Sequence, residues 1–351
     1  MIKKHRLLKQ QIKYSKLDIK KINMEQELGL YPKSFSLPIG LQFELTSKCN
    51  LFCKHCYNVS GENDKKDSMD IDKWKKLVDD IIKSGGIFQC IISGGEPLLM
   101  GDSLYDIMNP LHEDGTAFIL ITNGMLVNND TIKKLKKYNF YWVQVSIDDV
   151  LAEAHDDFRE HIGSWEKAIN AAFLFAGAGF PLRIAHSTTP KNLERLPDMI
   201  DLAYKLGASS IVCGSIMPSG RANENSNIYS HTDEYFNKLY STIEICQAKY
   251  SGRMEVLINS DLVVDMEMKQ HTPNSAAVIR PNGNVRMDCT MPFTIGNVLE
   301  DSIVNIWQEV GINSWNSELA NDYIKSLDEF SNHPTHTNHI DLDIKLYEEK
   351  K

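Results

Sequence analysis

Three cysteines set close together are the residues of this sequence with the clearest chemistry. Cys49, Cys53 and Cys56 lie within eight residues, in the stretch Cys-Asn-Leu-Phe-Cys-Lys-His-Cys. Thiolates are the usual ligands of iron-sulfur clusters, and a four-iron cluster ordinarily takes four of them. Three cysteines leave one iron open to bind a small molecule, so the spacing favours a reactive cluster. Two other interpretations stay open: a structural iron-sulfur centre, and a zinc site completed by His55 or a remote ligand.

The other cysteines do not indicate a disulfide framework. The chain has 351 residues and seven cysteines, an odd number in a chain too long to need covalent staples. No run approaches the roughly 18 consecutive apolar residues of a membrane span. The first residues also lack the apolar core of a secretory signal. We therefore expect a cytoplasmic protein without a transmembrane segment.

A glycine-rich motif follows the second predicted strand. Two adjacent glycines let the backbone approach a ligand closely and expose its amide and carbonyl groups. A simple turn is the alternative interpretation of such a tetrapeptide. The motif consists of Gly94, Gly95, Glu96 and Pro97.

Polar residues also follow the third and fourth predicted strands. Thr122-Asn123-Gly124 and Ser146-Ile147-Asp148 stand in these places. Asn-Gly is also a common turn, and Ser-x-Asp is a common helix cap. Further along, Arg159 is able to bind a carboxylate through its guanidinium fork, or to form an ordinary surface salt bridge.

Repeated strand-helix units must position these motifs. Apolar, β-rich runs alternate with helical patterns, which is typical of βα units around a parallel sheet. Barrel active sites are built from the loops that follow such strands, so we expect an α/β fold with a partial (β/α)6 TIM-like barrel. The six predicted strands are 41–46, 88–93, 117–122, 141–147, 181–187 and 209–216.

The pattern changes after a predicted helix near residues 232–250. Asn282-Gly283 stands between two apolar runs and predicts a hairpin, and a helix with Ile303, Ile306 and Trp307 on one face follows it. We expect a small α+β extension that does not continue the barrel. The expected division is a basic segment at 1–39, the barrel at 40–250, the extension at 255–330 and a loose polar tail at 331–351.

Charge is distributed unevenly along the chain. Residues 1–21 carry eight Lys or Arg and one Asp, a net charge of +7, whereas the whole chain carries −9. We expect a solvated basic helix at this end, and docking of an acidic peptide or a membrane surface is the alternative. The acidic remainder argues against a nucleic-acid partner.

Together these motifs make residues 40–217 resemble the radical S-adenosylmethionine (SAM) superfamily. Its three-cysteine signature has the same spacing, with an aromatic residue before the last cysteine, a place that His55 fills. The resemblance implies one [4Fe-4S] cluster held by Cys49, Cys53 and Cys56, with SAM bound at the open iron. It also implies reductive cleavage of SAM to a 5'-deoxyadenosyl radical that abstracts hydrogen from a substrate. A cellular reductant such as flavodoxin or ferredoxin would supply the electron. The implied SAM contacts are His55, Gly94, Gly95, Glu96, Pro97, Asn123, Ser146, Asp148 and Arg159.

The segment from Val278 to Trp307 resembles the C-terminal extension called SPASM, or its shorter twitch form. Family members with this extension commonly modify ribosomally made peptides, which implies a peptide substrate. Such extensions bind auxiliary clusters through many cysteines, but here only Cys289 stands at a matching place and no cysteine follows it. We therefore expect no auxiliary cluster.

The missing auxiliary ligands favour redox-neutral chemistry such as epimerisation, although cross-linking stays open. In an epimerisation a cysteine thiol would return hydrogen to the substrate, with Cys289 as the candidate donor and Cys213 as the reserve. The alternative for each is a small buried hydrophobic residue. Two other functions stay open: a radical SAM enzyme acting on a cofactor precursor or sugar, and a non-catalytic iron-sulfur protein.

Overall fold

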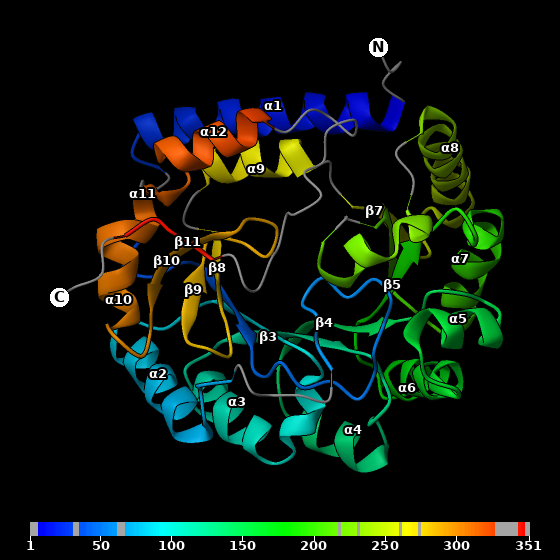
Figure 1. Cartoon of the computed structure of the whole chain (residues 1–351), viewed down its shortest axis with the longest axis horizontal. Helices are drawn as coiled ribbons and strands as arrows, with labels where there is room; N and C mark the ends of the chain where they lie inside the picture. The colour runs from blue at the N-terminus through cyan, green and yellow to red at the C-terminus, as the bar shows by residue number, and fades with distance from the viewer. Residues whose placement is uncertain are drawn as a thin grey trace.

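Parallel strands in chain order build the wall of an open barrel (Figure 1). The computed structural model describes residues 6–30, 35–61, 67–216, 219–229, 232–259, 262–272, 275–326 and 343–347. All six predicted strands are present, and each ends within two residues of its predicted end. The parallel strands are β1 (Gly40–Glu44), β2 (Gln89–Ser93), β3 (Ala117–Thr122), β4 (Phe140–Ser146), β5 (Leu182–Thr188), β6 (Ser210–Ser215) and β7 (Glu255–Ile258).

Helices cover the outer face of this sheet (Figure 1). Helix α2 shows why they form: Asp70 caps its first turn by accepting from the Lys73 amide, and its apolar stripe, which includes Trp74, is buried. The predicted helix at 232–250 is confirmed as α8, with Thr232 as its cap. The helices around the barrel are α2 (Ile71–Lys83), α3 (Ser103–Glu113), α4 (Asn129–Leu135), α5 (Ala152–Arg159), α6 (Ser164–Gly177), α7 (Leu196–Lys205) and α8 (Asp233–Tyr250).

The strands separate an apolar layer from a polar lumen. Successive side chains of a strand point to opposite faces. In β1, Leu41 and Phe43 are buried beneath the helices, and the Phe43 ring lies 5.2 Å from that of Trp74. Gln42 points to the other face, where its Nε2 donates to Ser93 Oγ over 3.0 Å. The core therefore lies between sheet and helices, and the inner face of the barrel is left for polar chemistry.

The predicted hairpin forms, but the expectation that it does not continue the barrel is wrong. Strand β8 (Ala276–Ile279) pairs in parallel with β1, so the same sheet runs through the hairpin. Strand β9 (Asn284–Arg286) is antiparallel to β8, and β10 (Phe293–Asn297) is antiparallel to β9. Strand β7 adds a further parallel strand beyond β6, inside the range assigned to the extension. Pairing between β1 and β8 joins segments too far apart in sequence for a local pattern to reveal.

A layer of helices closes the side of the molecule away from α3 and α4 (Figure 1). The basic segment forms α1 (Arg6–Glu27), as predicted, and α1 packs on α9 (Leu262–His271). Helix α12 (Glu318–Ser326) packs on α9 as well. Between β10 and α12 the chain forms α10 (Ile303–Ile306), the π-helical turn η5 (Trp307–Gly311) and α11 (Ile312–Ser314). None of the helices in the described ranges combines the length and apolar character that a membrane crossing requires.

The predicted loose tail is partly wrong. Residues 343–347 lie on the sheet, because β11 (Ile344–Lys345) pairs in parallel with β10. The Asp343 carboxylate forms an ion pair with Arg286. The other residues of the predicted tail lie outside the described ranges.

Candidate active site

The three cysteines lie on the loop that follows β1, at the C-terminal edge of the parallel sheet. The Cys49 amide donates to the Gly61 carbonyl over 2.6 Å, and the Cys56 amide donates to the Cys53 carbonyl over 3.2 Å. These bonds close the loop at both ends. The motif is therefore held as a folded unit beside the ends of the neighbouring strands.

Residues 219–229, after β6, contact this loop from the other side. They were not predicted from the sequence. Arg221 Nε donates to the Cys53 carbonyl over 2.9 Å, and its guanidinium lies 3.9 Å from the centre of the Phe52 ring. Gly220 has φ +55°, and a Cβ there would lie 2.4 Å from the Cys56 carbonyl oxygen. Gly220 is followed by Arg221 in a polar stretch directly after a predicted strand, which is the one local signal that pointed to them.

The glycine motif lies against the backbone that leads into the cysteines. The Gly95 amide donates to the Thr46 carbonyl over 2.7 Å, and the Glu96 amide donates to the Lys48 carbonyl over 2.8 Å. A Cβ on Gly95 would lie 1.9 Å from the Lys48 oxygen. Gly94 has φ +129°, and a Cβ there would lie 2.7 Å from the Thr46 oxygen. The glycines thus permit a close backbone contact that no other residue allows.

The approach at Gly95 predicts that Gly95→Ala disrupts the cysteine loop. The added methyl group overlaps the Lys48 carbonyl, so the loop must shift, and displacements of about 1 Å cost on the order of a hundredfold in rate. We expect a loss of that size in SAM cleavage, measured as 5'-deoxyadenosine. Gly177→Ala is the matched control because a Cβ there meets no atom within 4 Å. Equal activity of the two variants would contradict this description of the loop.

Glu96 links the glycine motif to the loop after β3. Its carboxylate is fully buried and accepts from Thr122 Oγ1 and from the Asn123 amide, each over 2.8 Å. Burial raises the pKa of Glu96 to about 7, although these hydrogen bonds oppose the shift. The carboxylate therefore positions Asn123, and direct contact of Glu96 with SAM stays a prediction. Pro97 starts the short helix η1 (Pro97–Met100) directly after it.

Two side-chain N–H groups point at cysteine sulfurs. Asn123 Nδ2 lies 3.7 Å from Cys49 Sγ, and Arg159 Nη1 lies 4.0 Å from Cys53 Sγ. Burial raises the pKa of Cys49 to about 12 and that of Cys53 to about 11. Metal binding offsets the cost of such buried thiolates, and hydrogen bonds to the sulfurs tune iron-sulfur clusters. The donor set therefore fits an iron-sulfur cluster held by these thiols.

Within the described residues, no three His, Cys, Asp or Glu side chains converge as the ligands of a single metal ion do. The His55 ring is stacked on Phe158, with centroids 4.3 Å apart and planes 2° apart. Burial lowers the pKa of His55 to about 4, which keeps the ring neutral. A role for His55, as a zinc ligand or beside SAM, stays a prediction.

Asp148 and Arg159 form a buried ion pair. Arg159 Nε donates to Asp148 Oδ2 over 2.8 Å, and the second carboxylate oxygen accepts from the Ser187 amide over 3.0 Å. Burial alone would raise the pKa of Asp148, but the charge of Arg159 and the effects of further nearby groups together hold that pKa below its ordinary value. The Arg159 fork, expected to bind a SAM carboxylate, is thus already paired with Asp148. Ser146 precedes Asp148 by two residues and is half-buried at the end of β4.

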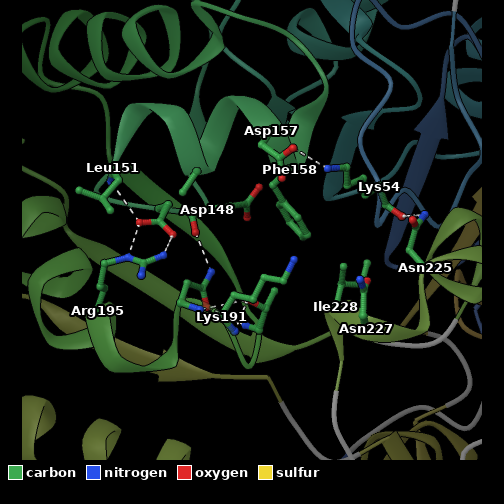
Figure 2. Close-up of a pocket in the computed structure, with 14 residues that line it drawn as sticks. Lys54, Asp148, Leu151, Asp157, Phe158, Lys191, Arg195, Asn225, Asn227 and Ile228 are labelled. Atoms are coloured by element: carbon green, nitrogen blue, oxygen red, sulfur yellow. Dashed lines mark hydrogen bonds and ion pairs between the residues drawn. The ribbon is translucent and has the colours of Figure 1, made fainter.

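A cavity of about 440 Å³ opens beside Asp148, which lies in its wall (Figure 2). This volume is in the range of small-molecule sites. Side chains reach it from α5, from the loop after β5 and from the cysteine loop, and Arg195 is fixed there by an ion pair with Asp149. Asp148 is one of the site residues predicted from the sequence. The other polar residues of the wall were not predicted, and they include Lys54, Lys191, Asn192, Arg195 and Asn225.

The two candidate hydrogen donors lie in different places. Cys289 follows β9 and lies within reach of the charges of Glu44, at the end of β1, and of Tyr57, directly after the cysteine loop. Burial, together with the charges of Asp288 and Glu44, raises its pKa well above the ordinary value. Cys213 instead points into the helix layer, is completely buried and lies near Cys246 of α8. The reserve role for Cys213 is therefore contradicted, because its thiol does not face the lumen.

Comparison with known proteins identifies the class. The Radical SAM superfamily model matches residues 43–203. The AdoMet-dependent heme synthase of Methanosarcina barkeri is 31% identical over 294 residues, which cover 78% of this chain and 83% of the relative. The chain therefore belongs to the radical SAM superfamily, and it is a radical SAM enzyme. The predicted membership is confirmed.

Two further comparisons concern a protein of bacteriocin biosynthesis and a crystal structure with bound S-adenosylmethionine. The antilisterial bacteriocin subtilosin biosynthesis protein AlbA of Bacillus subtilis is 27% identical over 284 residues, covering 78% of this chain and 60% of AlbA. The crystal structure of Streptococcus suis SuiB bound to S-adenosylmethionine has a TM-score of 0.65 at 14% identity, covering 83% of this chain and 68% of SuiB. The likeness to SuiB confirms the predicted partial-barrel fold.

Proposed function

We propose that this enzyme modifies a peptide by hydrogen abstraction and hydrogen return, in the manner of an epimerase. The family's SAM and iron-sulfur cluster supply a radical that removes hydrogen from unactivated carbon. AlbA, whose name assigns it to bacteriocin biosynthesis, supports the choice of a peptide. The buried Cys289 thiol near Glu44 and Tyr57, beside the cysteine loop, carries the proposal, because hydrogen return requires a second group close to the substrate.

Each part of the site has a task in this proposal. Cys49, Cys53 and Cys56 would hold the cluster, and the cavity beside Asp148 offers space for part of SAM. Asn123 and Arg159 direct N–H groups at the sulfurs of Cys49 and Cys53. The shape of this shell, fixed by Glu96 and Arg221, places SAM and excludes water from the reacting atoms.

Cys289 is suited to donate a hydrogen atom because it stays protonated. Its raised pKa keeps the thiol neutral at physiological pH. Hydrogen transfer forms a C–H bond on the substrate, breaks the S–H bond and leaves a sulfur radical. One electron from a cellular reductant such as flavodoxin or ferredoxin, and one proton from solvent, restore the thiol. The net change in the substrate is inversion without oxidation, so one cluster suffices.

Cys289→Ala tests the donor directly. We expect the variant to keep its iron and to form 5'-deoxyadenosine, but to lose formation of the inverted product, because no thiol is available to return hydrogen. Mass spectrometry measures both products, and an iron assay checks the cluster. Cys246→Ala is the control, since Cys246 is buried in α8 away from the lumen. A normal product from Cys289→Ala would remove the proposed role.

Co-expression tests the choice of a peptide. The enzyme is expressed with each short open reading frame beside its gene, and the purified peptides are analysed by mass spectrometry after reaction in D₂O. Because the donor thiol exchanges with solvent, an inverted residue gains one deuterium in place of hydrogen. A peptide that gains about 1 Da in D₂O and none in H₂O supports epimerisation. Loss of hydrogen in both solvents would contradict it and favour cross-linking.

A small-molecule substrate is the second candidate, and one observation favours it. The relative from Methanosarcina barkeri is named a heme synthase, which acts on a cofactor rather than on a peptide. Under this alternative no neighbouring peptide changes in mass, while a cofactor precursor increases deoxyadenosine formation. Measuring deoxyadenosine with peptides and with tetrapyrroles in parallel distinguishes the two candidates.

A further inference from the structure

Two buried arginines face the lumen from neighbouring strands. Arg280 directly follows β8 and Arg286 ends β9, and each side chain is only 1% exposed. Val278 is opposite Arg286 in the ladder, and Arg280 is two residues beyond Val278, so both guanidiniums lie on the same face. Buried guanidiniums need carboxylate partners with good geometry. Two carboxylates contact these arginines, Glu44 and Asp343.

The barrel wall provides one partner. Glu44, at the end of β1, lies with Oε2 3.4 Å from Arg280 Nε, and its Oε1 accepts from the Tyr57 hydroxyl over 3.0 Å. Arg280 Nη2 donates to Asn58 Oδ1 over 3.0 Å. Because Tyr57 follows Cys56 directly, these contacts join the arginines to the cysteine loop.

The second partner comes from the C-terminal segment. Asp343 Oδ1 accepts from Arg286 Nε over 2.7 Å, and Oδ2 accepts from Asn284 Nδ2 over 2.6 Å. Its carboxylate is nearly buried, whereas both residues of β11 beside it are exposed. The segment thus lies along β10 (Figure 1). Its Asp343 carboxylate contacts Asn284 and the buried Arg286.

The Asp343 carboxylate does not form a hydrogen bond with Arg280. Its Oδ1 lies 3.7 Å from Arg280 Nη1, which is too long for a hydrogen bond. Among the described residues, Nε and Nη1 of Arg280 find no hydrogen-bond partner. Arg280 Nε faces Glu44, so Nη1 is the donor that is left near the Asp343 carboxylate. Arginine forks bind a carboxylate best in pairs of parallel bonds, so a carboxylate placed closer to Nη1 would satisfy Arg280 better.

The backbone contacts of the segment resemble the way an extended peptide joins a sheet. The Ile344 amide donates to the Pro292 carbonyl over 2.8 Å, and the Leu346 amide donates to the Thr294 carbonyl over 2.9 Å. Main-chain bonds of this kind give affinity for any extended chain, while pockets for alternate side chains give specificity. Here Arg280 and Arg286 provide such a pocket, and their positive charges favour an acidic side chain.

We propose that Arg280 and Arg286 form a carboxylate subsite that binds an acidic residue of a peptide added as a strand along β10, and that Asp343 fills it in the free enzyme. The choice of a peptide rests on the proposed function. The carboxylate chemistry rests on the arginines alone. A tethered segment competes at an effective concentration near millimolar, so a free acid binds well only when Asp343 is removed.

Binding of a labelled peptide to Asp343→Asn tests this subsite. The probe is acetyl-Asp-Ile-Lys-Leu-Tyr-amide, the sequence of residues 343–347, and a second probe has Asn in place of Asp. By fluorescence anisotropy we expect Asp343→Asn to bind the Asp probe at least about tenfold more tightly than the wild type, and the Asn probe no better than the wild type does. Asp322→Asn is the control, since that carboxylate is exposed on α12. Equal affinity of Asp343→Asn for both probes would overturn the proposal.

Acetate provides a second measurement, which does not depend on the binding of a peptide. In Asp343→Ala the subsite lacks its carboxylate, so acetate is expected to raise the temperature of thermal unfolding, whereas the same concentration of chloride is not. Absence of an acetate effect would overturn the carboxylate subsite. An acetate effect without peptide binding would assign the subsite to a small carboxylate and overturn the added strand. Both measurements omit SAM and reductant, so a failure of the proposed reaction is distinguishable from a failure of this subsite.

Discussion

Replacing Cys53 by alanine is expected to remove the cluster and to lower 5'-deoxyadenosine formation by more than about a hundredfold. Loss of an outer-shell partner of a metal site costs 10- to 100-fold, and Cys53 is itself one of the predicted ligands. Its sulfur is buried beside Arg159, so no solvent ligand has easy access to take its place. Iron content and deoxyadenosine are measured on the same anaerobically reconstituted sample.

The control for this prediction is Cys246→Ala, which removes a buried thiol from α8 and leaves the cysteine loop intact. We expect the control to retain iron and activity. If Cys53→Ala kept both as well, the assignment of the cluster to these three cysteines would be wrong.

Asp148→Ala is expected to destabilise the protein by about 3–5 kcal/mol, because it leaves the Arg159 charge buried and unpaired. The Arg159 side chain is 7% exposed and that of Asp148 is 1% exposed, and Asp148 also accepts from the Ser187 amide. Urea unfolding of the iron-free protein measures the free energy of unfolding, provided that the transition is two-state. The stabilisation is present above the ordinary aspartate pKa near 3.8 and is lost as the pH falls below it, because the folded-state pKa is lowered.

Asp79→Ala is the matched control for the buried pair. Asp79 pairs with Lys83 on the exposed face of α2, where 57% and 69% of the side chains are accessible. Exposed pairs of this kind contribute little to stability, because solvent screens the two charges. Similar losses for the two variants would show that the Asp148–Arg159 pair is not the buried, unscreened contact described above.

Local patterns were enough to predict the barrel strands and the order of the motifs. Each strand is a short apolar run bounded by turn residues, and the hairpin follows from Asn282-Gly283, where Gly283 adopts φ +86°. The motifs converge because parallel strands bring their C-terminal ends to one edge of the sheet. That convergence placed Cys49, Glu96 and Asn123 together, as the sequence analysis expected.

Pairings between distant segments were beyond the reach of the sequence. The β1–β8 ladder joins the hairpin to the barrel, and nothing local distinguishes β8 from a strand of a separate extension. Arg159, at the end of α5, pairs with Asp148, a partner that no local pattern identifies, and its contact with SAM stays a prediction. Asp343 lies in a polar stretch whose composition gives no indication that one carboxylate reaches the lumen. Such contacts depend on the completed fold.

The most direct test of the central claim is SAM cleavage by the wild-type protein after anaerobic reconstitution. The protein is reduced with dithionite in the presence of SAM, and mass spectrometry detects 5'-deoxyadenosine while an iron assay is run on the same sample. We predict deoxyadenosine together with about four irons per chain, as expected for one four-iron cluster. A four-iron cluster without deoxyadenosine would contradict radical SAM activity, and about eight irons per chain would contradict the single cluster.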